Sequence, residues 1–197
     1  MNRKVLLSMG FAAPVAFWAT TIVCGRMLGD YDHLHFLVSE LGALGTPSQH
    51  VFSAGLVLCS ILNVLFVLAL YRCCREQHLN AAPAALLLFF SFLAGPALVP
   101  MPLPLHNVVG MPMLVFFLSP PAALLLWTGE RPPLELGGFA ALALVLIGLG
   151  FLVYFPGVLA GFYGLKQRFM YAGWTIWSSG LAFRFLQRCP ALRRPAL

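Results

Sequence analysis

Six long apolar runs constrain the fold of this chain more than any other feature of its sequence. They cover residues 5–28, 47–71, 81–99, 105–127, 136–161 and 169–186. Each is close to the roughly 20 residues that an α-helix needs to cross a bilayer. With 60% hydrophobic and only 9% charged residues, against about 25% charged in soluble domains, the chain has too much apolar surface for water. The sequence therefore predicts an all-α polytopic membrane protein, a single domain over residues 1–197 that forms a six-transmembrane-helix bundle.

The basic residues lie at the ends of these runs and predict the orientation of the bundle. The net charge is +6, but the chain has no separate basic domain of the kind that binds nucleic acid. Basic residues near helix ends are retained in the cytoplasm during insertion. If the N-terminus is inside, three basic residues lie outside: Arg26, Lys166 and Arg168. The other nine lie inside: Arg3, Lys4, Arg72, Arg75, Arg131, Arg184, Arg188, Arg193 and Arg194. We expect a multi-pass protein of the plasma (inner) membrane with both termini cytoplasmic.

The loop after the first run contains signals for two helix ends. Thr46 is placed to cap the second helix, with Pro47 at its first position and Gln49 completing a capping box. Residues 32–44 have helical character and stop at glycines. The sequence predicts a short helix on the outer surface here.

The fourth and sixth runs contain residues that modify a simple transmembrane helix. Prolines inside a helix remove hydrogen bonds, so Pro112, Pro120 and Pro121 predict a broken or strongly kinked fourth helix. Aromatic side chains flank the outer boundary near the sixth run and are typical of an interfacial belt: Phe162, Tyr163, Phe169, Tyr171 and Trp174.

The densest polar cluster follows the first run. Residues 30–40 contain two aspartates, two histidines, a serine and a glutamate. The predicted topology brings His106, Lys166 and Arg168 to the same face. Ionisable groups near a membrane are costly unless paired and indicate a functional site.

Three interpretations of this cluster compete. In the first, His33, His35 and His106 hold a catalytic zinc ion, since three histidines with one open position are a known zinc arrangement. This interpretation conflicts with the predicted surface helix, because the side chains of His33 and His35, two residues apart, would diverge on a helix. In the second, Asp32, His35 and Ser39 share one helical face as the acid, base and hydroxyl of a hydrolase. In the third, ion pairs between acids and Arg26, Lys166 or Arg168 only hold the helix ends together, or the two last cations bind a lipid phosphate.

Residues 32–47, DHLHFLVSELGALGTP, resemble the hallmark of a prokaryotic membrane family catalogued as domain of unknown function 998. The resemblance covers most of the chain: the six-helix plan, the motif at residues 39–42, a histidine opening the fourth helix at His106, and Gln167-Arg168 before the sixth. Residues 99–105 depart from the family pattern because they carry no acid. More distantly, residues 39–42 look like a motif of damage-regulated autophagy modulators and GPI-anchor lipid-remodelling proteins, which implies lipid-related work.

These observations lead to one expected function and its alternatives. We expect an outer-face polar site that handles a lipid or lipid-linked substrate, as in a hydrolase or transferase. Glu40, His106 and Arg168 should meet in space, with Glu40 or His106 as acid/base and Arg168 as headgroup anchor. Asp32, His33, His35, Ser39 and Lys166 are auxiliaries. The alternatives are a non-catalytic lipid binder or transporter, for which a broken fourth helix would hold substrate, and an accessory membrane subunit.

Overall fold

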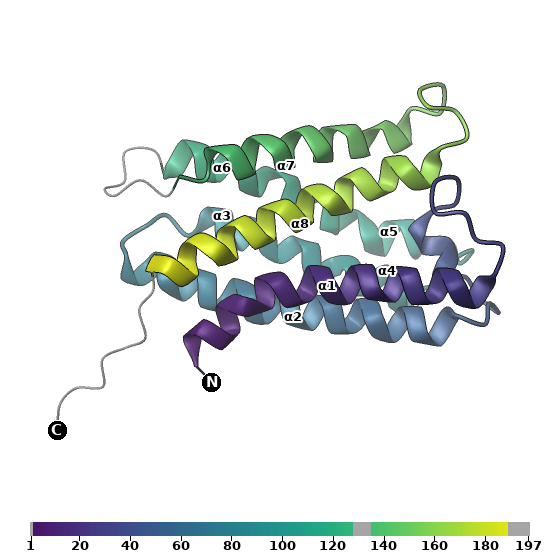
Figure 1. Ribbon diagram of the computed structural model, residues 1–197, viewed down its shortest axis with the longest axis horizontal. Coiled ribbons are helices and arrows are strands. Elements are labelled where there is room, and N and C mark those ends of the chain that lie inside the picture. The colour runs from purple at the N-terminus through teal and green to yellow at the C-terminus, as the bar shows by residue number, and fades with distance from the viewer. Residues whose placement is uncertain (1, 128–134, 189–197) are drawn as a thin grey trace.

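The computed structural model describes residues 2–127 and 135–188, and every regular element within these ranges is a helix (Figure 1). The α-helices and 3₁₀ helices (η) follow in the order α1 Arg3–Leu28, η1 Val38–Gly42, α2 Gln49–Glu76, α3 Ala82–Leu88, η2 Phe89–Leu93, α4 Ala94–Leu98, α5 His106–Gly110, η3 Met111–Leu118, α6 Ser119–Leu126, α7 Gly137–Gly150, η4 Phe151–Tyr154 and α8 Tyr163–Arg188. The predicted fold class, an all-α polytopic membrane protein, is confirmed.

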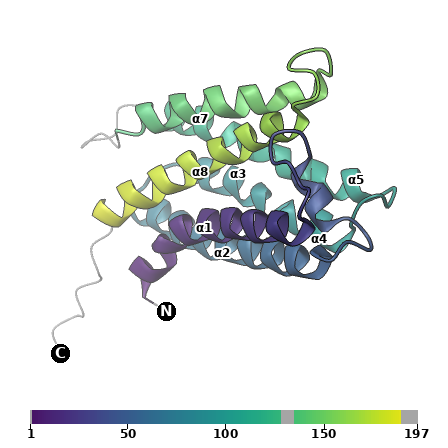
Figure 2. The same cartoon turned by 45° about the vertical axis from the view of Figure 1, so that its right-hand side comes forward.

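Helical segments occupy all six predicted runs. Among the described residues, four helices are long and apolar enough to cross a membrane: Arg3–Leu28, Gln49–Glu76, His106–Leu126 and Gly137–Tyr154. The third run forms a shorter apolar segment, Ala82–Leu98. The sixth forms α8, whose 26 residues extend about 39 Å at 1.5 Å per residue. Because α1 and α7 pack along α8, much of its surface contacts protein instead of lipid (Figures 1 and 2).

Aromatic side chains fill the centre of the bundle beside α8. The ring of Trp174 stacks on Phe90 of η2 with centroids 3.8 Å apart, and the Tyr171 ring lies 4.4 Å from Phe17 of α1. Tyr171 and Trp174 are buried, so their prediction as interfacial belt residues is wrong. The reason is that α8 begins at Tyr163, which places both residues two to three turns inside the helix.

Charged side chains gather at the two ends of the bundle. α1 begins and α8 ends at one end (Figure 1). There Arg3 pairs with Glu76 at 2.5 Å and Arg184 with Glu135 at 3.0 Å. Arg131, Arg193 and Arg194 lie outside the described residues. We call the opposite end, which carries residues 29–48, 99–105 and 155–162, the loop end.

The loop between α1 and α2 contains less helix than expected. Only η1, Val38–Gly42, is helical, and residues 33–35 form a turn. The Asp32 carboxylate accepts the Leu34 N–H at 2.7 Å, and the Tyr31 hydroxyl lies 3.1 and 2.7 Å from the carbonyl oxygens of Phe36 and Leu37. The predicted surface helix over residues 32–44 is therefore wrong in extent, because side chains take up the backbone groups that a helix would use.

The second helix also begins later than predicted. α2 starts at Gln49, after Ser48. Thr46 is not its N-cap, since its hydroxyl donates to the Ala43 carbonyl at 2.8 Å. Gln49 accepts the Gly45 N–H at 2.8 Å. These side chains bind the turn that precedes the helix.

The prolines of the fourth run change the type of helix without leaving a gap. α5 continues directly into η3, and η3 into α6. Prolines occupy the first positions of η3 and α6, where a missing N–H costs least. The predicted break is thus a 3₁₀ stretch over Met111–Leu118.

The boundary between the last two helices differs from the prediction. α7 and η4 end at Tyr154, and α8 begins at Tyr163, whereas the apolar runs predict an end at 161 and a start at 169. Pro156 lacks an N–H, and Leu159 and Gly161 have positive φ, 49° and 85°. α8 includes Lys166 and Arg168 because both find partners at the loop end.

Candidate functional site

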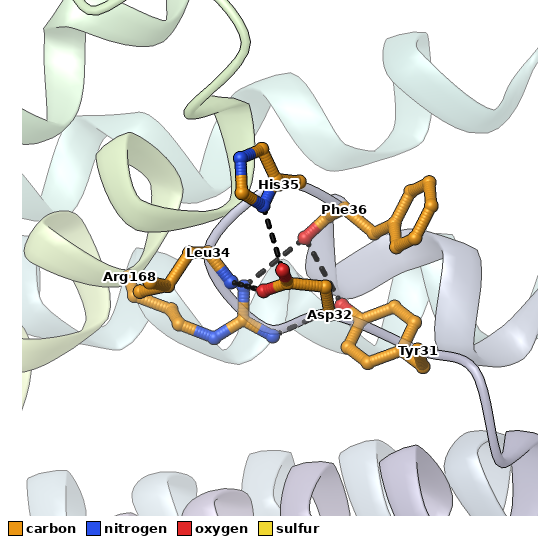
Figure 3. A network of polar contacts seen from close by, with 6 residues as sticks. All are labelled: Tyr31, Asp32, Leu34, His35, Phe36 and Arg168. Atoms are coloured by element: carbon orange, nitrogen blue, oxygen red, sulfur yellow. Dashed lines mark hydrogen bonds and ion pairs between the residues drawn. The ribbon is translucent and has the colours of Figure 1, made fainter.

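Arg168 binds the loop between α1 and α2, residues 29–48, to the start of α8. We call this loop the first loop. Its Nη1 donates to the carbonyl oxygens of Phe36 and Gly164, each at 3.1 Å. Its Nη2 lies 2.9 Å from the Tyr31 hydroxyl and 2.8 Å from His33 Nδ1. Figure 3 shows the guanidinium reaching into the curve of the loop. The predicted headgroup anchor therefore has four intramolecular partners.

Backbone groups of α8 continue this docking. The Leu165 N–H donates to the Leu34 carbonyl oxygen at 2.8 Å, and the Gly164 N–H donates to the His35 carbonyl oxygen at 3.2 Å. The first N–H groups of a helix have no partner within it, so the loop caps α8. A Cβ on Gly164 would collide with the carbonyl oxygen of Phe36 and lie 2.7 Å from that of His33. Glycine is what allows this approach.

Asp32 and His35 form a separate pair on the surface of the loop (Figure 3). His35 Nδ1 lies 2.7 Å from Asp32 Oδ2, and their side chains are 47% and 50% exposed. The Leu34 amide and then the His35 ring hold the pKa of Asp32 below its ordinary value. Two members of the predicted Asp-His-Ser set thus meet, but Ser39 Oγ instead lies 3.1 Å from Met101 Sδ and makes no hydrogen bond to His35.

His33 faces inward beside Arg168. Burial, and then the charge of Arg168, lower the pKa of His33 from its ordinary 6.5. Because a guanidinium only donates, His33 Nδ1 is the acceptor of this hydrogen bond and the ring is neutral. Burial also raises the pKa of Tyr31. Both groups therefore favour their neutral forms around the guanidinium.

Lys166 is fully buried beneath the loop that follows η4. Its Nζ donates to the carbonyl oxygens of Val158 at 2.9 Å and Phe155 at 3.3 Å. It also lies 4.6 Å from the centre of the Tyr163 ring. These contacts position the loop, and they occupy a side chain that the sequence predicted to bind substrate.

Glu40 and His106 have local partners as well. Glu40 Oε1 accepts the Leu37 N–H at 2.8 Å. His106 is 8% exposed, and its Nδ1 lies 2.7 Å from the Val99 carbonyl oxygen. A carbonyl only accepts, so Nδ1 carries a proton; when the ring is neutral, Nε2 is then an acceptor.

The predicted meeting of Glu40, His106 and Arg168 is not made by direct contacts. No hydrogen bond or ion pair joins any two of them in the described structure. The three histidines proposed for zinc bind three different partners, and no group of three metal-ligating side chains occurs among residues 2–127 and 135–188. The structure thus gives no support to a zinc site at His33, His35 and His106.

A cavity of about 390 Å³ lies near the loop end. We call it the loop-end cavity. It is lined by the first loop, α2, the third and fourth helical segments, η4 and α8. Most of the lining is apolar, including Phe52, Leu56, Met101, Met113, Leu114 and Met170. Ser39 and His106 are the two predicted site residues that line it.

The remaining polar groups of the cavity were not predicted as site residues: Asn107, Tyr154, Gln167 and Tyr171. Gln167 Oε1 accepts the Val38 N–H at 2.6 Å, which leaves its amide N–H groups for another partner. Tyr171 is 4% exposed, yet its hydroxyl has no hydrogen bond to any described residue. The spacing of Gln167 and Tyr171, four residues apart on one helical face, is the sequence signal that could have identified them.

A family model matches residues 11–184 of the chain, and its description reads "Protein of unknown function (DUF998)". No curated protein and no solved structure matches the sequence. The match covers most of the chain, including the first loop, the start of α5 and the start of α8.

Proposed function

The chain belongs to the DUF998 family of proteins of unknown function, and we propose that it binds a membrane lipid in the loop-end cavity. The cavity itself is the observation that carries this proposal. Its volume, about 390 Å³, lies within the roughly 300–1,000 Å³ of small-molecule sites. Its walls are mostly apolar, while Ser39, His106 and Gln167 supply polar groups to its lining. A lipid likewise combines an apolar chain with a polar head group.

The charged residues at the loop end support this function indirectly. Arg168 holds the loop that forms the cavity's roof, and Lys166 holds the loop beside Tyr154. Their roles are to position these walls. The substrate-binding roles predicted for them are replaced in the proposal by Ser39, His106 and Gln167.

Acyl transfer is a second candidate because Ser39 and His106 line one cavity. A serine nucleophile needs its base within hydrogen-bonding reach. Here Ser39 Oγ contacts Met101 Sδ, and His106 Nδ1 contacts a carbonyl. Binding without covalent chemistry is therefore the function that we propose.

The proposal places the loop end on the outer face of the plasma membrane, with both termini in the cytoplasm. It is supported by the basic residues at the opposite end, which include Arg3, Lys4, Arg72 and Arg75. A membrane-impermeant maleimide applied to intact cells should label Asp30→Cys and leave an Arg75→Cys variant unlabelled. Labelling of both from the same side would contradict this orientation.

A larger side chain in the cavity should block lipid binding. Leu114 lines the cavity from η3, and tryptophan there would occupy the space of the lipid chain. We expect Leu114→Trp to weaken binding about tenfold, or roughly 1.4 kcal/mol. The measurement is the amount of lipid extracted per purified protein, quantified by mass spectrometry.

Leu118→Trp is the matched control. Leu118 belongs to the same helix, is 42% exposed and does not line the cavity. It should retain the lipid content of the unsubstituted protein. Equal lipid content in the two variants, with both folded, would show that the extracted lipid lies elsewhere.

A further inference from the structure

The loop-end cavity is lined by hydrogen-bonding groups that carry no formal charge when His106 is neutral. No Asp, Glu, Lys or Arg among the described residues lines it. The Gln167 oxygen accepts the Val38 N–H, and the amide N–H groups of Gln167 make no hydrogen bond to any described residue. In the neutral ring of His106, Nε2 is an acceptor. The Ser39 oxygen has lone pairs free while its proton lies toward Met101. Donors and acceptors in the lining of one cavity suit a hydroxyl, which is both.

The nearby cations are not available to a charged head group. Arg168 has four intramolecular hydrogen-bonding partners. Lys166 is fully buried and bound to two carbonyl oxygens. A phosphate in the cavity would lose its hydration without gaining a cation, and burying an unpaired charge is strongly unfavourable.

A second polar level lies deeper in the cavity. Tyr171 follows Gln167 by four residues on α8, which is about 6 Å along the axis at 1.5 Å per residue. Tyr171 is buried and lines the cavity, and its hydroxyl has no partner among the described residues. Buried tyrosine hydroxyls normally find a partner. A ligand with a hydrogen-bond acceptor at this depth would accept a hydrogen bond from the Tyr171 hydroxyl.

We propose that the ligand is an uncharged single-chain ester lipid of the monoacylglycerol class. This inference rests on the proposed lipid-binding function. The glycerol hydroxyls bind Gln167, His106 and Ser39, and the ester carbonyl accepts a hydrogen bond from the Tyr171 hydroxyl. The acyl chain then lies against the apolar wall formed by residues such as Leu56, Leu114 and Met170.

Three probes with the same chain separate the parts of this proposal: monooleoylglycerol, its ether analogue without the carbonyl, and oleoyl lysophosphatidate. Each is titrated against delipidated protein in detergent by native mass spectrometry. The ester should bind about two- to tenfold more tightly than the ether, which is the range of one net hydrogen bond. The phosphate should bind at least about tenfold more weakly than the ester, because its charge is unpaired.

Tyr171→Phe tests the carbonyl contact. The replacement removes a hydroxyl that has no partner in the described structure, so the thermal unfolding of the protein should be unchanged. Affinity for the ester should fall to that for the ether, and affinity for the ether should not change. An equal fall for both probes would overturn the carbonyl assignment.

The outcomes distinguish this inference from the proposed function. Tighter binding of lysophosphatidate than of monooleoylglycerol would overturn the uncharged head group while leaving lipid binding intact. If none of the three probes bound, and Leu114→Trp left the extracted lipid unchanged, the proposed function itself would fail.

Discussion

Replacing Gly164 by alanine should lower the free energy of unfolding by about 2–3 kcal/mol, at the upper end of typical overpacking. The added Cβ would collide with the Phe36 carbonyl oxygen and lie 2.7 Å from that of His33 and 2.8 Å from Arg168 Nη1. Two of these neighbours are backbone atoms, so the first loop must move as a unit. We expect the shift to disturb the roof of the loop-end cavity as well. Thermal unfolding and lipid content of the purified variant measure the two effects.

Gly148→Ala is the control for this prediction. Gly148 is exposed in the last turn of α7, directly before η4, and a Cβ there meets no atom within 4 Å. Alanine favours a helix interior over glycine by up to about 1 kcal/mol, so this variant should be as stable as the parent or more so. If Gly164→Ala behaved like Gly148→Ala, the close contact between the loop and α8 would be wrong.

Replacing Arg168 by methionine should cost about 2–4 kcal/mol. Methionine keeps much of the side-chain length but removes every donor of the guanidinium. The Tyr31 hydroxyl and the Phe36 carbonyl then lose a charge-assisted hydrogen bond, each such bond contributing roughly 1.5–3 kcal/mol without being additive. The unfolding temperature should fall, and the first loop should become accessible to protease.

Arg26→Met is the control, because it removes one positive charge without removing the hydrogen bonds that Arg168 makes. Arg26 is exposed in the last turn of α1 at the loop end, and its side chain makes no hydrogen bond or ion pair with any described residue. Its replacement should change stability by less than about 0.5 kcal/mol. Equal losses in the two variants would mean that net charge, and not the hydrogen bonds of Arg168, stabilises the loop end.

Lys166 and Arg168 show why the fold was easier to predict than the site. Apolar runs near 20 residues long report directly on helices in a bilayer, and all six contain helix. A cation near a membrane needs a partner, and the sequence offered carboxylates such as Glu40. The actual partners of both cations include main-chain carbonyl oxygens, which every residue possesses and no sequence pattern distinguishes.

The cavity was only partly predictable for a similar reason. Ser39 and His106 stand out as polar residues at the ends of apolar runs. Gln167 and Tyr171 belong to one helical face, but an apolar run that begins at 169 places Gln167 outside the helix. α8 starts at Tyr163 because the first loop caps it. That contact joins residues about 130 positions apart, as the hydrogen bond from Leu165 to Leu34 shows.

An experimental density map of the protein purified in a mild detergent tests the central claim most directly. Lipid binding predicts an elongated density in the loop-end cavity, with its polar end beside His106 and Gln167 and its tail toward Leu56. The same map should lose this density in the Leu114→Trp variant. A cavity that holds only water, or that is closed by protein side chains in the unsubstituted protein, would contradict the account.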